Sequence, residues 1–302
     1  MANLKEIRTR IASVASTRQI TSAMKMVAAA KLKKAQDAVT HFRPYAFKMQ
    51  EIMLHITSSV GQDEDNVYAD DREYSNVLVV AITTNRGLCG AFNSNVIKEA
   101  MLQSEKKYFS YFEPVKIRYM AIGKKGNDLL TKRKVSLEAP NTEIIERLTY
   151  DSASELAQSL MDYFIAGRYD CIDIVYNEFI NAASQKVIYK QFLPLLPEAH
   201  HESNGKRKRN SGKTKHPDYI FEPTKKYILR ELIPQNLRLI LYEALLDSVA
   251  SEYGARMTSM HQATDNASAL IQELTLQYNK ARQSAITNEI LEIVGGAEAL
   301  KG

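Results

Sequence analysis

Hydrophobic positions recur with a helical period at both ends of the 302-residue chain. Residues 2 to about 57 contain no glycine, and their apolar and small residues step by three, four or seven, which is the spacing of one helix face. Pro44 removes a backbone donor inside this stretch, so we expect the helix to bend near Thr40. The predicted stripe comprises Ile7, Val14, Thr21, Met24, Ala28, Ala35, Ala38, Phe42, Tyr45, Met49, Ile52 and Ile56.

A second stripe with the same spacing follows Pro234, which is expected to start the carboxy-terminal helix. The pair Gly295-Gly296 is expected to stop it. This stripe comprises Tyr253, Met257, Met260, Thr264, Ala267, Ile271, Leu274, Tyr278, Ala281 and Ala285.

The two predicted helices are too long for a compact globule. At 1.5 Å per residue each spans roughly 80 to 90 Å, whereas a globule of this chain length is about 50 Å across. Residues 1–50 carry a net charge of +8 and residues 231–302 a net charge of −4, so the two ends attract each other. We therefore predict a protruding antiparallel coiled coil, with close axes allowed by Ala28, Ala35, Ala38, Ala267, Ala281 and Ala285.

The middle of the chain alternates strand and helix patterns. Residues 77–82 (VLVVAI) form a continuous apolar run, which is typical of a strand buried on both faces. Further strands are predicted at 117–122, 171–176 and 186–192, and helices at 95–108, 124–132 and 152–166. This order implies right-handed crossovers and a mostly parallel sheet.

The predicted fold class is therefore α/β, with a long antiparallel coiled coil of the terminal helices and an inserted Rossmann-like α/β domain. The predicted divisions are an N-terminal coiled-coil helix, a central α/β domain and a C-terminal coiled-coil helix, at 1–58, 76–228 and 230–302.

A basic block lies late in the central domain. Residues 203–216 hold six Lys or Arg, no acid and no apolar residue, and we expect a solvated surface loop. A nucleic-acid site is less favoured, because no aromatic residues lie between these Lys and Arg residues to stack on nucleobases.

The cysteine content and the lengths of the apolar runs indicate in which cellular compartment the protein folds. The net charge is +5, and the only cysteines, Cys89 and Cys171, lack CxxC spacing, which favours buried thiols in a reducing compartment. No apolar run approaches the roughly 18 to 20 residues that cross a bilayer, and no secretory signal is recognised. We expect a protein that is neither secreted nor membrane-spanning.

Evidence for a catalytic site is weak. The turn at 83–90 (TTNRGLCG) enters a helix and could cradle phosphate, but it contains neither GxGxxG nor a P-loop, and the turn at 123–126 (GKKG) lacks the hydroxyl that would hold magnesium. Structural turns are favoured there. The six histidines form no HExxH and no i, i+4 pair, so no metal is expected.

Both ends resemble one family. Residues 11–31 (IASVASTRQITSAMKMVAAAK) closely resemble the amino-terminal helix of gamma subunits of F-type ATP synthases, bacterial type, and residues 286–299 (ITNEILEIVGGAEA) resemble the carboxy-terminal signature of that family. The signature positions are Ile286, Thr287, Glu289, Gly295, Gly296 and Ala297. The resemblance continues through ASEYGARM, ATDNA and YNKARQ, and more loosely through RGLCG and YNEF, at 250–257, 263–267, 278–283, 86–90 and 176–179.

The resemblance implies a rotor shaft that is not itself catalytic. It would turn inside a hexamer of alpha and beta subunits, couple proton flow to ATP synthesis from ADP and phosphate, and regulate ATPase activity. The α/β domain would meet the epsilon subunit and the membrane c-ring, with delta also in the complex. No cofactor, metal or nucleic acid is implied. The chain would be peripheral, at the cytoplasmic face of a bacterial inner membrane, and the absence of a transit peptide before Met1 favours a bacterial origin.

The resemblance also implies contacts with the beta subunit. Arg282, Gln283 and Thr287 match family residues that hydrogen-bond a beta-subunit loop, and Met24, Lys25 and Met26 match positions facing its moving lever. Asn85 stands where the family usually has Asp.

Two other functions stay open from the residues alone. A nucleotide-binding α/β enzyme that dimerises through its coiled coil predicts that the isolated chain binds nucleotide. A basic coiled-coil nucleic-acid binder predicts affinity that falls steeply with salt.

Overall fold

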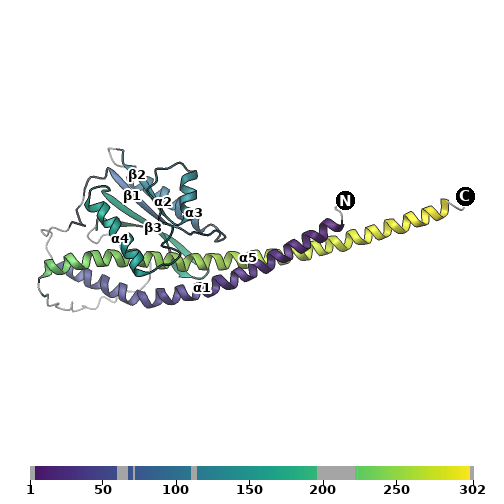
Figure 1. The fold of residues 1–302 in the computed structure, drawn as a ribbon, viewed down its shortest axis with the longest axis horizontal. Helices are drawn as coiled ribbons and strands as arrows, with labels where there is room; N and C mark the ends of the chain where they lie inside the picture. The colour runs from purple at the N-terminus through teal and green to yellow at the C-terminus, as the bar shows by residue number, and fades with distance from the viewer. Residues whose placement is uncertain are drawn as a thin grey trace, which may run out of the picture. The chain divides into compact units, whose positions relative to one another are not determined.

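The computed structural model describes residues 4–59, 67–70, 72–109, 114–195, 222 and 224–299. Helices at both ends flank a central run of strands and helices (Figure 1). The order is α1 (Leu4–Ser59), β1 (Asn76–Ile82), α2 (Phe92–Tyr108), β2 (Lys116–Ile122), α3 (Lys124–Lys132), α4 (Tyr150–Ile165), β3 (Cys171–Asn181), β4 (Ser184–Leu193) and α5 (Lys225–Ala299).

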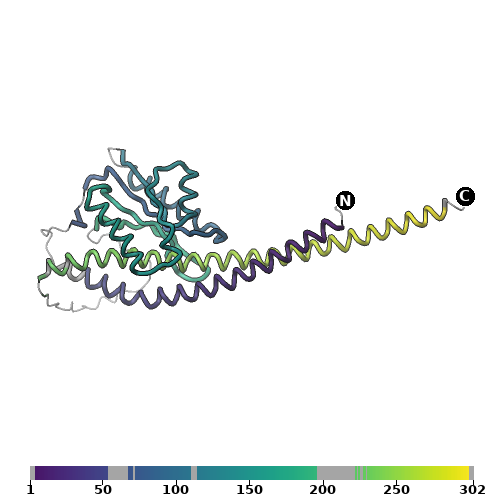
Figure 2. Tube along the Cα trace, in the orientation of Figure 1, coloured from purple at the N-terminus to yellow at the C-terminus, as the bar shows by residue number. Residues whose placement is uncertain are grey.

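The chain forms two compact units, each with parts of α1 and α5. The helical unit comprises Met1–Lys31 and Arg256–Gly302, and the α/β unit comprises Leu32–Ala255. Figure 2 follows both long helices along the chain by colour. The predicted boundaries at 58 and 76 lie within one residue of the end of α1 and the start of β1, whereas those at 228 and 230 lie inside α5. The division into domains stays a prediction.

In the helical unit, α1 and α5 run antiparallel (Figure 1), and the side chains buried between them form one seam. Ala28 and Ala267 are 2% and 7% exposed, and the hydroxyl oxygens of Thr21 and Thr264 lie 2.9 Å apart. These small side chains let the two helices approach closely. Every position of the predicted α5 stripe from Met257 to Ala281 is buried or half-buried, which confirms the predicted coiled coil there.

Both predicted ends of α5 are wrong. The helix begins at Lys225, nine residues before Pro234, and continues through Gly295-Gly296 to Ala299. Burial of Ile233 and Leu237 beside the proline offsets the cost of roughly 3 kcal/mol for an internal proline. Neither glycine is among the positive-φ residues of the described chain, so the left-handed turn that usually ends a helix does not form here.

The sheet confirms the predicted topology. Its order is β2-β1-β3-β4, with β1 parallel to both β2 and β3, and β4 antiparallel to β3. Residues Val77 to Ile82 are at most 1% exposed, because alternate side chains enter two cores. One core includes residues of α2 and the other residues of α4 and α5.

Beyond residue 31 the predicted α1 stripe holds only in part: Ala35, Phe42, Met49 and Ile52 are half-buried. Ala38 and Tyr45 are exposed, whereas Leu32, Val39 and Met53 are buried in their place. The buried positions are set by the core of the α/β unit, to which Met53 belongs, and not by a two-helix seam alone. No observation tests the bend predicted near Thr40, and the predicted basic loop at 203–216 lies outside the described residues.

Candidate functional site

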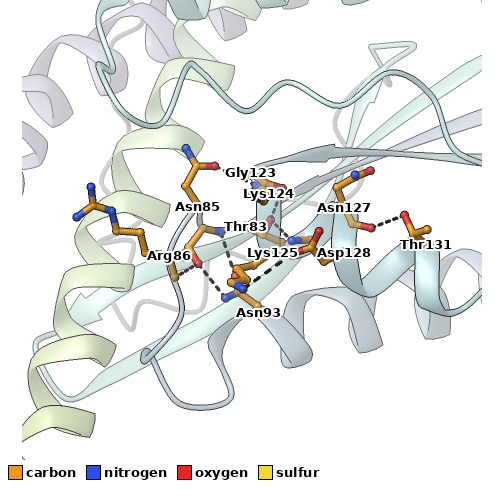
Figure 3. A network of polar contacts seen from close by, with 12 residues as sticks. Thr83, Asn85, Arg86, Asn93, Gly123, Lys124, Lys125, Asn127, Asp128 and Thr131 are labelled. Atoms are coloured by element: carbon orange, nitrogen blue, oxygen red, sulfur yellow. Dashed lines mark hydrogen bonds and ion pairs between the residues drawn. The ribbon is translucent and has the colours of Figure 1, made fainter.

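The glycine turn after β1 is closed by its own hydrogen bonds. Figure 3 shows Thr83 and Asn85 pointing at the start of α3. The backbone N–H groups at that start bond to protein oxygens: Lys124 to Asn85 Oδ1 at 2.9 Å, Lys125 to the Thr84 carbonyl at 2.9 Å, and Gly126 to Thr83 Oγ1 at 3.0 Å. A phosphate would need these same donors. The backbone N–H donors at the start of α3 are therefore already hydrogen-bonded within the protein.

The glycines of the second turn, between β2 and the start of α3, serve packing. A Cβ at Gly126 would lie 2.3 Å from Thr83 Oγ1, and one at Gly123 would lie 2.5 Å from the Thr83 carbonyl oxygen. Gly123 also has φ +107°, a conformation that other residues rarely adopt. Both glycines are explained by the close approach of α3 to the end of β1, which confirms the expectation of a structural turn at 123–126.

A hollow of about 300 Å³ beside this turn does not suit a nucleotide. Arg86 and Lys124 line it, but so do Glu143 and Glu146. The two carboxylates oppose a polyphosphate, and the hollow is at the small end of the range for ligand pockets.

Deeper in the α/β unit, Asp173 forms a buried polar cluster that sequence reasoning missed. Its carboxylate is 0% exposed and accepts from Lys107 Nζ at 2.8 Å and from the hydroxyls of Tyr108 and Tyr189 at 2.6 Å each. Burial, reinforced by the Asp173 charge, raises the pKa of both tyrosines, so they remain hydroxyl donors. The cluster connects α2 to β3 and β4. No signal for it is visible in the sequence, because the pattern of residues along β3 does not show which side chains from other elements meet Asp173.

Both cysteines are buried and neither forms a disulfide, as expected. Burial, followed by the charge of Asp173, raises the pKa of the Cys171 thiol to about 12, which keeps it unreactive. Among the residues that the structure describes, no cluster of three His, Cys, Asp or Glu could hold a metal ion. None of the described helices is long and apolar enough to cross a membrane.

The predicted contact residues all lie in the helical unit, in two separate places. Met24 and Lys25 are half-buried and Met26 is 65% exposed on α1. Arg282, Gln283 and Thr287 are exposed on α5, where the Thr287 hydroxyl donates to the Gln283 carbonyl at 2.9 Å. With Thr21 opposite Thr264, the α1 and α5 groups lie roughly 30 Å apart along the helix axes. The structure therefore does not bring them together.

The last turns of α5 are exposed on every side. All residues from 282 to 298 are exposed, including the signature residues Glu289, Gly295, Gly296 and Ala297. In the antiparallel pair α1 begins at Leu4, so α5 has no partner helix in its last part (Figure 2). The exposed residues include five large apolar side chains: Ile286 48%, Ile290 54%, Leu291 62%, Ile293 66% and Val294 53%. Their spacing was visible in the sequence, but their exposure depends on where α1 begins.

These features define a class of subunit. Its exposed polar and apolar side chains lie along two paired long helices, and its α/β unit has a closed turn at the place where a nucleotide would bind. A family model described as ATP synthase matches residues 3–300. The ATP synthase gamma chain of Flavobacterium psychrophilum is 53% identical over 302 residues, covering 100% of both chains, and that of Flavobacterium johnsoniae is 52% identical with the same coverage. The chain belongs to the ATP synthase gamma-chain family.

Solved structures show the same fold. The rotor of the Euglena gracilis mitochondrial ATP synthase aligns with a TM-score of 0.59 at 23% identity, covering 94% of this chain and 98% of that one. A chain of the OSCP/F1/c-ring part of the same enzyme aligns with a TM-score of 0.63 at 22% identity, covering 98% and 94%. The family and the closed turn together do not favour the nucleotide-binding enzyme.

Proposed function

We propose that this gamma-family chain is the central rotor shaft of an F-type ATP synthase, coupling proton flow through the membrane sector to ATP synthesis in the beta subunits. The observation that carries this proposal is the helical unit, which buries one seam and leaves its other faces exposed. The reacting groups would belong to the beta subunits, and this chain would supply mechanical coupling and regulation of ATPase activity.

The coupling would work through differential contacts. A two-helix shaft lacks threefold symmetry, so three surrounding beta subunits would each meet a different face. A shaft angle that binds one conformation of a nucleotide site more tightly stabilises that conformation, and rotation passes the preference to the next site. Exposed polar side chains such as Arg282 and Gln283 support this role, because water-mediated contacts can be exchanged at low cost as the shaft turns.

The proposed beta-subunit contacts are the two groups of residues on α1 and α5 of the helical unit. Met24, Lys25 and Met26 would meet the moving lever, and Arg282, Gln283 and Thr287 a fixed loop. Their separation along the axis supports two different contacts rather than one. Both groups offer side-chain donors or apolar atoms at exposed or half-buried positions.

Further partners belong to the same proposal. The relatives include chains of assemblies named for F1, OSCP and the c-ring. By analogy, the α/β unit would meet epsilon and the c-ring, with alpha, beta and delta completing the complex. The chain would then be peripheral, on the cytoplasmic face of a bacterial inner membrane.

The test is the double variant Arg282→Ala with Gln283→Ala in vesicles holding the assembled enzyme. Loss of a charge-assisted hydrogen bond, about 1.5–3 kcal/mol, predicts a fall in ATP synthesis of at least about tenfold. The matched control is Gln277→Ala with Lys280→Ala, which likewise removes one cationic and one amide side chain from exposed positions on the same helix. Unchanged synthesis with normal subunit content would overturn the assignment of these contacts.

A further inference from the structure

One charged junction in the α/β unit joins both long helices to the sheet. Arg43 of α1 places Nη2 3.3 Å from Asp247 Oδ1 on α5 and donates from the same nitrogen to the Phe179 carbonyl of β3 at 3.2 Å. Residues 43 and 247 lie 204 positions apart in the chain. A single guanidinium therefore connects three elements.

Two further contacts extend this junction along α5. Ser251 Oγ donates to the Asn177 carbonyl at 3.2 Å, and a Cβ at Gly254 would lie 2.9 Å from the Ala182 carbonyl oxygen. Asp247, Ser251 and Gly254 are separated by four and three residues, so they share one face of the helix. This face of α5 follows the second half of β3 closely.

The junction holds more negative than positive groups. The Asp247 side chain is 6% exposed and faces charged or titratable groups from every element packed around it. They are Arg43 from α1, Glu243 from α5, Glu178 and Tyr176 from β3, and, through Glu243, Lys190 from β4. Three carboxylates thus share two cations.

Burial sets the protonation of this group. It raises the pKa of the Asp247 carboxyl to about 7, and the attraction of Arg43 only partly opposes that rise. Burial likewise raises the pKa of Glu243 and lowers the pKa of Lys190. Each shift favours the neutral form, because the site is poorly hydrated and the charges are not balanced.

We propose that Arg43 and Asp247 are positioning residues of a proton-sensitive lock that fixes β3 to the two long helices, so that torque passes between the sheet and the helices without slippage. The torque part rests on the rotor function proposed above. The closed lock is most stable when Asp247 carries a proton. Arg43 then still donates to Asp247 and to the Phe179 carbonyl, and the buried excess of negative charge is removed. It loosens as Asp247 ionises.

The direction with pH follows from linkage. The closed lock holds a proton on Asp247 up to about pH 7, whereas an opened, hydrated Asp247 loses it near the ordinary value of about 4. Between these values the closed state binds more protons, so its stability falls as pH rises. Opening should increase by up to about tenfold per pH unit between pH 5 and 7 and then level off.

The experiment is amide hydrogen exchange of residues 177–182 and 247–254 in the assembled enzyme between pH 5 and 8. Wild type is compared with Asp247→Asn at each pH, so the chemical pH dependence of exchange cancels. Asparagine keeps the shape and the acceptor but not the charge. We expect the wild-type to variant ratio of exchange rates to rise with pH up to about 7.

The control variant is Asp37→Asn, which removes an exposed carboxylate paired with Lys33 on α1. Its exchange should follow wild type at every pH. A constant ratio for Asp247→Asn, or the same rising ratio for Asp37→Asn, would overturn the lock. If Asp247→Asn fails to assemble, Glu243→Gln supplies the measurement, because neutralising either carboxylate relieves the same excess charge.

The torque part has its own measurement, protons pumped per ATP hydrolysed in vesicles as a function of pH. We expect Asp247→Asn to flatten the pH dependence of this ratio and Arg43→Lys to restore coupling better than Arg43→Gln. A pH profile identical to wild type would overturn the positioning role. Failure of the rotor function would appear differently, as normal exchange behaviour in a chain that assembles with no beta subunit.

Discussion

The two units bury their side chains in different ways. In the α/β unit, six consecutive residues of β1 are at most 1% exposed. In the helical unit, burial is confined to one seam between the two helices, and residues 282 to 298 are all exposed. The α/β unit thus contains its own core, whereas the helical unit leaves most of its surface for other molecules. Buried residues of the α/β unit therefore serve folding, whereas exposed residues of the helical unit can serve contact with other molecules.

The largest effect is expected from truncating a core leucine. Leu78→Ala in β1 removes a 0% exposed side chain and should lower the free energy of unfolding by about 2–5 kcal/mol. Leu291→Ala, at a position 62% exposed, is the matched truncation in the helical unit and should change it by less than about 0.5 kcal/mol. Denaturant titration of both variants measures the contrast, and equal losses would break the comparison.

An intermediate effect is expected in the glycine turn. Gly126→Ala places a Cβ against Thr83 and should cost about 1–3 kcal/mol, the range for overpacking. Gly87→Ala is the control, because its Cβ would meet only Lys125 Cε at 3.9 Å. Thermal unfolding of the two variants distinguishes a packing role from a ligand role. If Gly126→Ala instead left stability unchanged and abolished nucleotide binding, the closed-turn interpretation would be wrong.

A similar test applies to the seam of the helical unit. Ala28→Leu should separate α1 from α5 at a cost of about 1–3 kcal/mol, since Ala28 is 2% exposed. Ala30→Leu, at an exposed position one half-turn away, should be close to neutral. Hydrogen exchange of residues 21–31 and 260–271 would show the local loosening. Equal protection in both variants would mean that the seam does not depend on small residues.

The smallest effect is expected on the surface of α1. Lys33→Ala breaks an ion pair with Asp37 whose side chains are 75% and 49% exposed. Solvent screens such pairs, so the free energy of unfolding should change by about 0–0.5 kcal/mol. A denaturant titration that found a loss above 1 kcal/mol would show that this face of α1 is less exposed to solvent than the structure shows.

Local patterns predicted much of the fold. Helix α3 has the predicted bounds, and β1 and β2 each begin one residue earlier than predicted. These elements follow from short-range spacing and turn residues. The predicted stripe held in residues 1–31, where one partner helix determines burial, and held only in part beyond them, where a whole core does.

The polar junctions could not be predicted in the same way. Asp247 lies on a long helix where a carboxylate normally faces solvent, and its partner is 204 residues away. Asp173 interrupts an otherwise apolar strand, and its partners come from α2 and β4. Such pairings depend on tertiary placement. The contact residues on α1 and α5 came from resemblance alone, because an exposed helix face carries no signal of what covers it.

The rotor assignment is tested most directly by purifying a tagged copy of this chain from native membranes in mild detergent. Subunit stoichiometry by mass spectrometry and ATPase activity would be measured on the same sample. The account predicts one copy with three alpha and three beta subunits and active ATP hydrolysis. Recovery of the chain alone, or with nucleic acid and no ATPase activity, would contradict it.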